Sequence, residues 1–276
     1  KDFKNGILFS VLSGLTINAR IFGLFLPPLI FLIYFINILR EKSNKKKSYN
    51  PLILTVILTT FFIFLFWPYF LWENPIENFF YSLKVWSEQS LNIYNYYLGI
   101  NTFTTDLPWH YHIVWISVTT PIFYIILFLI GFIFIFRRII NRLFKIEKND
   151  SYDDLWRGNK ELQDLIFFLI FLVPLIFATN AREFNYDGWR VLYFIYPSFL
   201  LISLLGLHLI KVVFFKKRKN YFYALTLVCI IPTIFWMVNN HPYQNTYFNL
   251  LAGKNFDKKF DMDYFGISNK NALEFL

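Results

Sequence analysis

The chain has 276 residues, of which 56% are hydrophobic, 22% are aromatic and only 16% are charged, and its formal net charge is +9. Soluble domains carry fewer apolar and more charged residues, so this composition excludes an ordinary soluble protein. Several apolar runs reach the roughly 20 residues that a helix needs to cross a bilayer, and we therefore expect a polytopic integral membrane protein.

Seven hydrophobic segments follow one another along the chain. Open structures other than helices leave backbone polar groups unsatisfied in lipid, so each segment is predicted to be a helix. The expected fold class is all-α: a transmembrane helix bundle over residues 1–238, with an outer loop at 71–111, and an extracytoplasmic tail at 239–276. The segments are 6–19, 21–39, 51–70, 112–136, 163–179, 191–210 and 222–238.

The first residues read "KDFKNGILFS", with neither an initiator Met nor a signal peptide. Because this stretch is typical of the start of a membrane helix inside a longer protein, we expect an N-terminal part to precede it. The single cysteine, Cys229, lies in an apolar segment and cannot form a disulfide within the chain.

Basic residues are shared unevenly among the connections between these segments. Seventeen Lys and Arg lie in 40–50, 137–161 and 211–220, whereas seven lie in 71–111, 180–190 and the tail. By the positive-inside rule the first set is cytoplasmic, and the outer loop and the tail lie outside. The positive net charge therefore reflects membrane topology, and we expect no nucleic-acid partner. The expected location is a bacterial inner membrane, with the active face in the periplasm.

Prolines fall on one side of this topology, in the outer half of the segments in or near which they lie. Proline frees a backbone carbonyl and kinks a helix, so kinks on one side would splay the bundle and open an outward-facing cavity. The alternative is the general tolerance of membrane helices for proline. The residues are Pro27, Pro28, Pro68, Pro121, Pro174, Pro197 and Pro232.

Two arginines lie at the expected outer ends of the helices, Arg20 and Arg190. A guanidinium forms bidentate bonds to phosphate oxygens, so both are candidates for holding a lipid phosphate. Arg20 has an alternative role in snorkelling to the outer headgroups. Arg190 has an alternative role as an interfacial cap or as the ion-pair partner of Asp187.

The stretch "TTDLPWHYH" (104–112) places Asp106, His110 and His112 near the same surface. These residue types could form an acid–base group or a metal site. The alternative is the start of a helix, with Asp106 as its N-cap. The chain has no phosphate-binding loop, no Gly-rich dinucleotide loop and no nucleophile elbow.

Short motifs in order along nearly the whole chain resemble the GT-C class of integral membrane glycosyltransferases. The closest likeness is to the bacterial branch similar to protein O-mannosyltransferases and aminoarabinose transferases. The motifs are "GLTINARIFGL" (14–24), "LPWHYHIVWISVTTP" (107–121), "YDGWRVLYFIYPSFLL" (186–201), "HPYQNTYFNLLAG" (241–253) and "FDMDYFGISNKNALEFL" (260–276).

The resemblance implies a sugar donor linked to polyprenyl phosphate and transfer on the extracytoplasmic side. Arg20 and Arg190 match basic positions of the family, which adds to their case as lipid-phosphate contacts. The catalytic carboxylate of the family lies in a first outer loop, ahead of the region that 14–24 resembles. No residue here matches it, so the base is unknown and Asp106 is only a candidate.

Further candidates for substrate binding are His110, His112, Asp187 and Trp189. Tail residues such as Asn245 and Tyr247 either contact sugar or acceptor or form a folded cap.

We therefore expect a membrane glycosyltransferase whose partners are the polyprenyl-phosphate sugar, membrane lipid and an acceptor glycan, lipid or protein. No cofactor is identified, and a divalent metal is left open. One alternative is a flippase or other transporter for lipid-linked sugars, which is disfavoured because we expect the five segments from 51–70 onward to lack Asp, Glu, Lys and Arg. Another is a noncatalytic membrane subunit that binds a glycan or lipid.

Overall fold

In a computed structural model, the chain divides into two compact units. The N-terminal unit consists of residues 1–89 together with 151–153, and the C-terminal unit consists of residues 90–150 and 154–276. Each is described by itself. The structure describes residues 2–19, 21–40, 50–67, 69, 72–88, 93–144, 155–180, 185–263 and 265–275.

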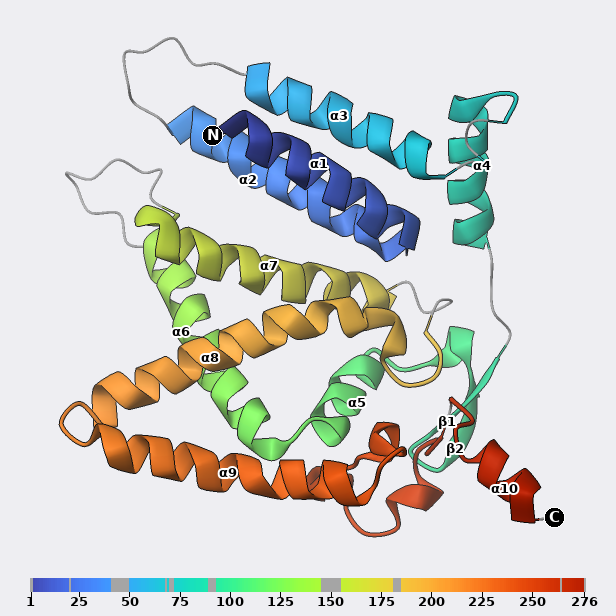
Figure 1. The fold of residues 1–276 in the computed structure, drawn as a ribbon, viewed down its shortest axis with the longest axis vertical. Helices are drawn as coiled ribbons and strands as arrows, with labels where there is room; N and C mark the ends of the chain where they lie inside the picture. Colours follow the sequence, from blue (N-terminus) through green and yellow to red (C-terminus); the bar gives the residue numbers. More distant parts are fainter. Residues whose placement is uncertain are drawn as a thin grey trace. The chain divides into compact units, whose positions relative to one another are not determined.

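The described elements of the N-terminal unit are all helices (Figure 1). Small polar side chains join its first and third helices, as Ser10 donates to the carbonyl of Thr55, and Thr59 donates to Ser10. Such interhelical hydrogen bonds hold apolar helices together in lipid. The elements are α1 (Asp2–Ala19), η1 (Ile21–Phe25), α2 (Leu26–Arg40), α3 (Asn50–Phe66) and α4 (Pro75–Glu88).

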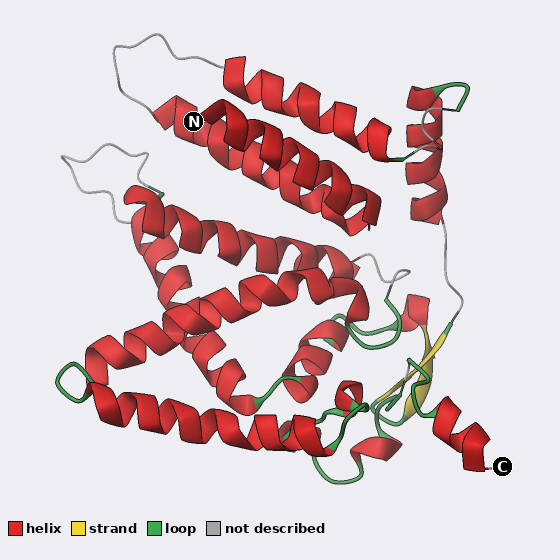
Figure 2. Cartoon of the chain, in the orientation of Figure 1, coloured by secondary structure: helices red, strands yellow, loops and turns green. Residues whose placement is uncertain are grey.

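The C-terminal unit combines long helices with one two-stranded hairpin, which is yellow in Figure 2. Its larger elements are β1 (Tyr94–Tyr97), β2 (Ile100–Phe103), α5 (Tyr111–Thr119), α6 (Ile122–Phe144), α7 (Gly158–Asn180), α8 (Tyr196–Phe214), α9 (Lys219–Asn239) and α10 (Asn269–Phe275). Short 3₁₀ turns are η3 (Thr104–Asp106), η5 (Arg190–Ile195), η6 (Gln244–Thr246), η7 (Leu250–Ala252) and η8 (Phe256–Lys258).

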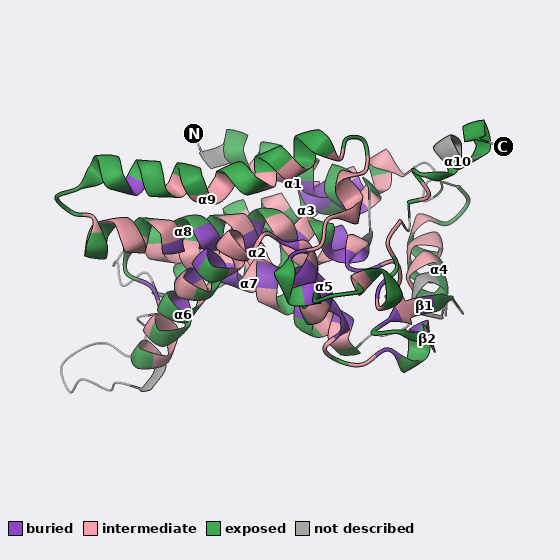
Figure 3. Cartoon of the chain, turned by 90° about the horizontal axis from the view of Figure 1, so that it is seen from below, coloured by how far each residue is buried: buried purple, intermediate pink, exposed green. Residues whose placement is uncertain are grey.

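Four helices in the described residues are long and apolar enough to cross a bilayer, so the chain is an integral membrane protein. Of these, α9 is the least covered by the rest of the protein and is largely exposed in Figure 3. The spans are Ile122–Arg142, Gly158–Asn180, Arg190–Phe214 and Lys219–Asn239. The apolar helices of the N-terminal unit are shorter, and their crossing of the membrane stays a prediction.

The segment predicted at 112–136 is two helices rather than one. Thr120 ends α5 in an extended conformation, with φ −103° and ψ 138°. Proline disfavours the helical conformation of the residue before it, and Pro121 follows Thr120. The chain therefore turns between α5 and α6, and only α6 is one of the four spans.

Helices α6 and α8 cross in close contact at two glycines. A methyl group added at Gly131 would overlap the carbonyl of Ile202, and one added at Gly206 would overlap the carbonyl of Leu127. Membrane helices have little hydrophobic force to drive them together, so close approach through small residues is a main source of their packing. The glycines therefore fix this crossing.

Phenylalanine rings fill the neighbouring layer between α6, α7 and α8. Phe128 stacks on Phe199 with ring centroids 4.4 Å apart, and it lies 4.8 Å from Phe171. Phe132 lies 4.9 Å from Phe168. Aromatic pairs at these separations add to the packing energy of a helix interface, so the high phenylalanine content builds the interior as well as the lipid-facing surface.

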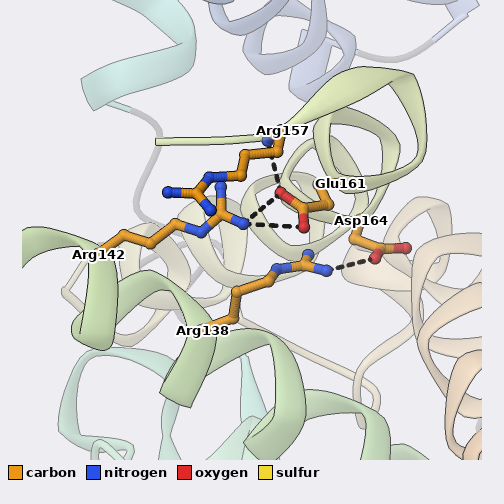
Figure 4. Close-up of polar contacts among 5 residues, drawn as sticks. All are labelled: Arg138, Arg142, Arg157, Glu161 and Asp164. Carbon is orange, nitrogen blue, oxygen red and sulfur yellow. Dashed lines mark hydrogen bonds and ion pairs between the residues drawn. The ribbon is translucent and has the colours of Figure 1, made fainter. Parts of the chain in front are cut away.

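Two ion pairs join the C-terminal end of α6 to the first turns of α7 (Figure 4). Arg138 lies 3.0 Å from the Asp164 carboxylate, and Arg142 lies 2.8 Å from that of Glu161. Asp164 lies inside the predicted segment 163–179, so the expectation that this segment lacks charged residues is wrong. Its arginine partner compensates the charge, and the pair lies near the helix end rather than at its middle.

The end of the C-terminal unit that carries α5 and the hairpin lies away from the α8–α9 turn (Figure 1). Sequence analysis does not foresee the hairpin, whose turn places Leu98 and Gly99 at positive φ. The tail docks on it: Gly99 donates to the carbonyl of Lys259, and Tyr97 pairs with Phe260. The part of the tail at 258–260 therefore packs against the hairpin.

Candidate functional site

A buried polar network ties α5 to the hairpin and to the segment before η5. The Tyr111 hydroxyl donates to Asn95 over 3.3 Å and accepts from the backbone N–H of Gly188 over 3.0 Å. Asn95 also accepts from the N–H of Asp187. Because Tyr111 is buried, its pKa is raised above the ordinary value of 10. Tyr111 is therefore a neutral structural link that holds residues 187–188 in place.

His112 lies inside the same network and is 1% exposed. The Asn185 amide nitrogen donates to the carbonyl of Ala178, so its oxygen faces His112 and accepts from Nε2 over 2.8 Å. Nε2 therefore carries the proton, and Nδ1 is a buried acceptor without a partner among the described residues. Burial lowers the pKa of His112 to about 4, and this outweighs the hydrogen bond with Asn185, which raises the pKa. The histidine is neutral at pH 7.

His110 and Asp106 are placed differently from His112. His110 Nδ1 lies 2.8 Å from the Tyr97 hydroxyl, and His110 precedes the first residue of α5. Asp106 is exposed at the end of η3 and contacts no other charged or hydrogen-bonding group in the described part of the chain. The predicted role of Asp106 as the N-cap is wrong, because His110 takes that position and makes no capping hydrogen bond.

Asp187 and Arg190 form an ion pair of 3.0 Å, with about a quarter of each side chain exposed. The Arg190 guanidinium also lies over the Tyr186 ring, 4.7 Å from its centroid. Burial raises the pKa of Asp187, Arg190 lowers it, and Asp261 raises it, with a net upward shift. The ion-pair alternative for Arg190 is therefore present, and a phosphate would have to share the guanidinium with Asp187. Arg20 lies outside the described residues.

A pocket of about 280 Å³, the aromatic–amide pocket, lies beside this segment. Its walls come from the C-terminal end of α5, the segment around η5, the start of α8 and the tail. They combine aromatic rings with amide and hydroxyl groups. The lining residues are Thr119, Thr120, Trp189, Tyr193, Tyr196, Gln244, Asn245 and Tyr247.

Trp189 is the central aromatic residue of the pocket. Its ring centroid lies 4.8 Å from that of Tyr193 and 5.7 Å from that of Tyr196, both edge-to-face. Its indole N–H donates to the Thr119 hydroxyl over 2.9 Å, so the ring cannot rotate without losing this bond. The pocket therefore has a fixed aromatic wall.

Two buried oxygens of the pocket residues have no hydrogen-bond partner among the described residues, Thr120 Oγ1 and Asn245 Oδ1. The Asn245 amide nitrogen donates to Asp263 over 2.9 Å, which sets its orientation. Burial would raise the pKa of Asp263, but hydrogen bonds from Ser268, Asn245 and Ile267 lower it to about 2. Both atoms are shielded from solvent, so the groups that a ligand in the pocket can reach are the other hydroxyl and amide groups of its wall.

Sequence analysis identifies Trp189 as a substrate contact and leaves Asn245 and Tyr247 open, and all three line this pocket. It misses the rest because they meet only through tertiary packing. The spacing of four and then three residues from Trp189 to Tyr193 and Tyr196, which places aromatic rings on one helical face, is the signal that could have found part of the wall.

No three His, Cys, Asp or Glu side chains gather as metal ligands within the described ranges. In comparisons with known proteins, no family model, curated protein or solved structure matches the chain.

Proposed function

We propose that the protein is a membrane glycosyltransferase that takes a sugar from a polyprenyl-phosphate donor on the extracytoplasmic side. The observation that carries the proposal is the aromatic–amide pocket in a membrane-embedded unit. The resemblance of the sequence motifs to the GT-C class agrees with it, and so does the separation of α5 and the tail from the basic α8–α9 turn.

The chemistry of the pocket fits a sugar ring. A pyranose has an apolar C–H face, which packs on the electron-rich face of an aromatic ring such as Trp189. Its hydroxyl rim both donates and accepts, and the pocket is lined by hydroxyl and amide groups that do the same, such as those of Tyr196 and Gln244. A volume of about 280 Å³ suits a small ligand rather than a lipid chain or a long glycan.

Arg190 is the described residue proposed to contact the phosphate of the donor. It follows Trp189 directly in the sequence, and its side chain is partly exposed. In the transfer step an acceptor hydroxyl attacks the anomeric carbon as the bond from that carbon to the phosphate oxygen breaks. The hydroxyl proton passes to a carboxylate base, and a fixed guanidinium stabilises the charge on the leaving phosphate.

The proposal is tested with the full-length protein in proteoliposomes, by transfer of radiolabelled sugar from a polyprenyl-phosphate donor. Tyr196→Phe keeps the aromatic ring of a lining residue and removes its hydroxyl, so it should change thermal stability little. The same change should lower transfer about three- to tenfold, the value of one hydrogen bond to the sugar. Trp189→Leu should lower transfer more, because it removes the aromatic wall.

Tyr221→Phe is the matched control, because Tyr221 lies in the first turn of α9 and does not line the pocket. It should not change transfer. Transfer at the wild-type rate in both pocket variants would remove the pocket from the reaction, and no sugar transfer by the wild-type protein would reject the proposed function.

A further inference from the structure

A second cavity of the C-terminal unit, the apolar pocket, has a volume of about 570 Å³. Its walls are the start of α6, the second half of α9 and tail residues 247–256. Most of the surface is hydrocarbon or aromatic. The lining residues are Pro121, Ile122, Phe123, Cys229, Pro232, Thr233, Trp236, Tyr247, Phe248, Asn249, Leu250, Gly253, Lys254 and Phe256.

Two prolines account for the opening between these elements. Pro121 separates α5 from α6, and Pro232 lies inside α9, so each interrupts a helical hydrogen-bond ladder at the wall of the pocket. These are two of the prolines from which an outward-facing cavity is predicted. The pocket lies between two membrane-spanning helices, and lipid is therefore the apolar molecule at highest concentration beside it.

The volume limits what the pocket can hold. A methylene group occupies roughly 30 Å³, about the share of one water molecule in the liquid, so the cavity accommodates at most about 19 methylene groups. That is the length of one acyl chain of a membrane phospholipid. A polyprenyl chain that is several isoprene units longer than this would not fit, and its end would extend out of the pocket.

One lysine lies at the rim of the pocket. Lys254 lines it and is exposed. The stretch "GKNFDKKF" (253–260) around it contains three lysines and one aspartate, Asp257. One ammonium group near the membrane surface strengthens the binding of an anionic headgroup about fivefold. Charge and shape together therefore favour a lipid with one chain in the cavity and a negative phosphate at Lys254.

We infer that the apolar pocket is a binding site for an anionic phospholipid, with one acyl chain between α6 and α9 and its phosphate at Lys254. This site is separate from the proposed catalytic function and does not depend on it. The two pockets share Tyr247 as a wall residue, so the polyprenyl carrier is the competing occupant that the test must distinguish.

Cys229 provides the test, because it lines the pocket and is the only cysteine in the chain. The full protein is placed in nanodiscs of phosphatidylcholine with increasing fractions of phosphatidylglycerol, and labelling of Cys229 by N-ethylmaleimide is timed. The rate should fall about fivefold once phosphatidylglycerol reaches about four times its dissociation constant, because the unoccupied fraction falls with occupancy.

In Lys254→Ala, the same degree of protection should require about five times more phosphatidylglycerol. The labelling rate of this variant in pure phosphatidylcholine should equal that of the wild type. Lys216→Ala is the control, because Lys216 lies in the α8–α9 turn at the other end of α9. Equal labelling rates in both lipids, or protection that Lys254→Ala leaves intact, would overturn the assignment. Stronger protection by polyprenyl phosphate than by phosphatidylglycerol would also overturn it and give the pocket to the carrier.

Discussion

His112 makes the stability of the protein sensitive to acid in a way that can be worked out from the structure. Burial lowers its pKa from 6.5 to about 4 in the folded protein. Between these pH values the unfolded chain binds a proton that the folded protein does not bind. The free energy of unfolding therefore falls as the pH falls from about 6.5 to about 4, and His112 contributes its full stabilisation only above this window.

The size of the effect follows from the shift. A pKa difference of about 2.5 units corresponds to about 3 kcal/mol in total, and about 2 kcal/mol of this is lost by pH 5. For a protein of this length, 1 kcal/mol corresponds to roughly 2–4 °C in the midpoint of thermal unfolding. The wild type should therefore lose about 4–8 °C between pH 8 and pH 5 through this residue.

His112→Gln isolates the effect, because glutamine offers an amide N–H to Asn185 and does not titrate. Asp187 and Asp261 have raised pKa values, so they make the free energy of unfolding rise as the pH falls. Their effect is the same in the wild type and in the variant, and it cancels in the comparison. Near-UV circular dichroism in detergent gives the midpoint at each pH. The wild type should lose about 4–8 °C more than the variant. Identical pH dependence in the two proteins would refute the buried, neutral histidine.

Further predictions concern topology and helix packing. In a Cys229→Ala background, a cysteine that replaces Ile100 in the hairpin should react with an impermeant thiol reagent added outside intact cells. A cysteine that replaces Lys216 should be protected, and the reverse pattern would invert the orientation. Gly131→Ala should destabilise the α6–α8 crossing by about 1–3 kcal/mol through overpacking. Leu204→Ala, at an exposed position of α8, should cost less in the same thermal unfolding assay, and equal losses would contradict the close crossing.

The membrane helices were the most predictable part of the fold. Hydropathy alone places α6, α7, α8 and α9, because a span must be long and apolar. Hydropathy does not reveal the break at Thr120, because apolar residues on both sides of Pro121 give one continuous hydrophobic segment. The hairpin is not predictable in this way either, since its aromatic residues lie in a polar connection between apolar segments, where no strand pattern stands out.

The candidate site was less predictable than the helices. Trp189 and Asp187 stand out by residue type, and both lie at the site region. The role of His112 as a buried link depends on Asn185, which lies 73 residues away in the sequence. The pocket depends on the tail folding back against α5 and α8. Contacts of this kind leave no periodic signal in the sequence.

The most direct test of the proposed function is the fate of the bond between sugar and phosphate in the donor. Full-length protein in proteoliposomes is given a polyprenyl-phosphate sugar and membranes of the source organism as the supply of acceptors, and free polyprenyl phosphate is measured together with transferred sugar. We expect equal amounts of the two products, and slower formation in Arg190→Ala. Donor that crosses the bilayer intact would indicate a flippase, and donor that is bound but unchanged would indicate a noncatalytic subunit; either result would contradict the assignment as a glycosyltransferase.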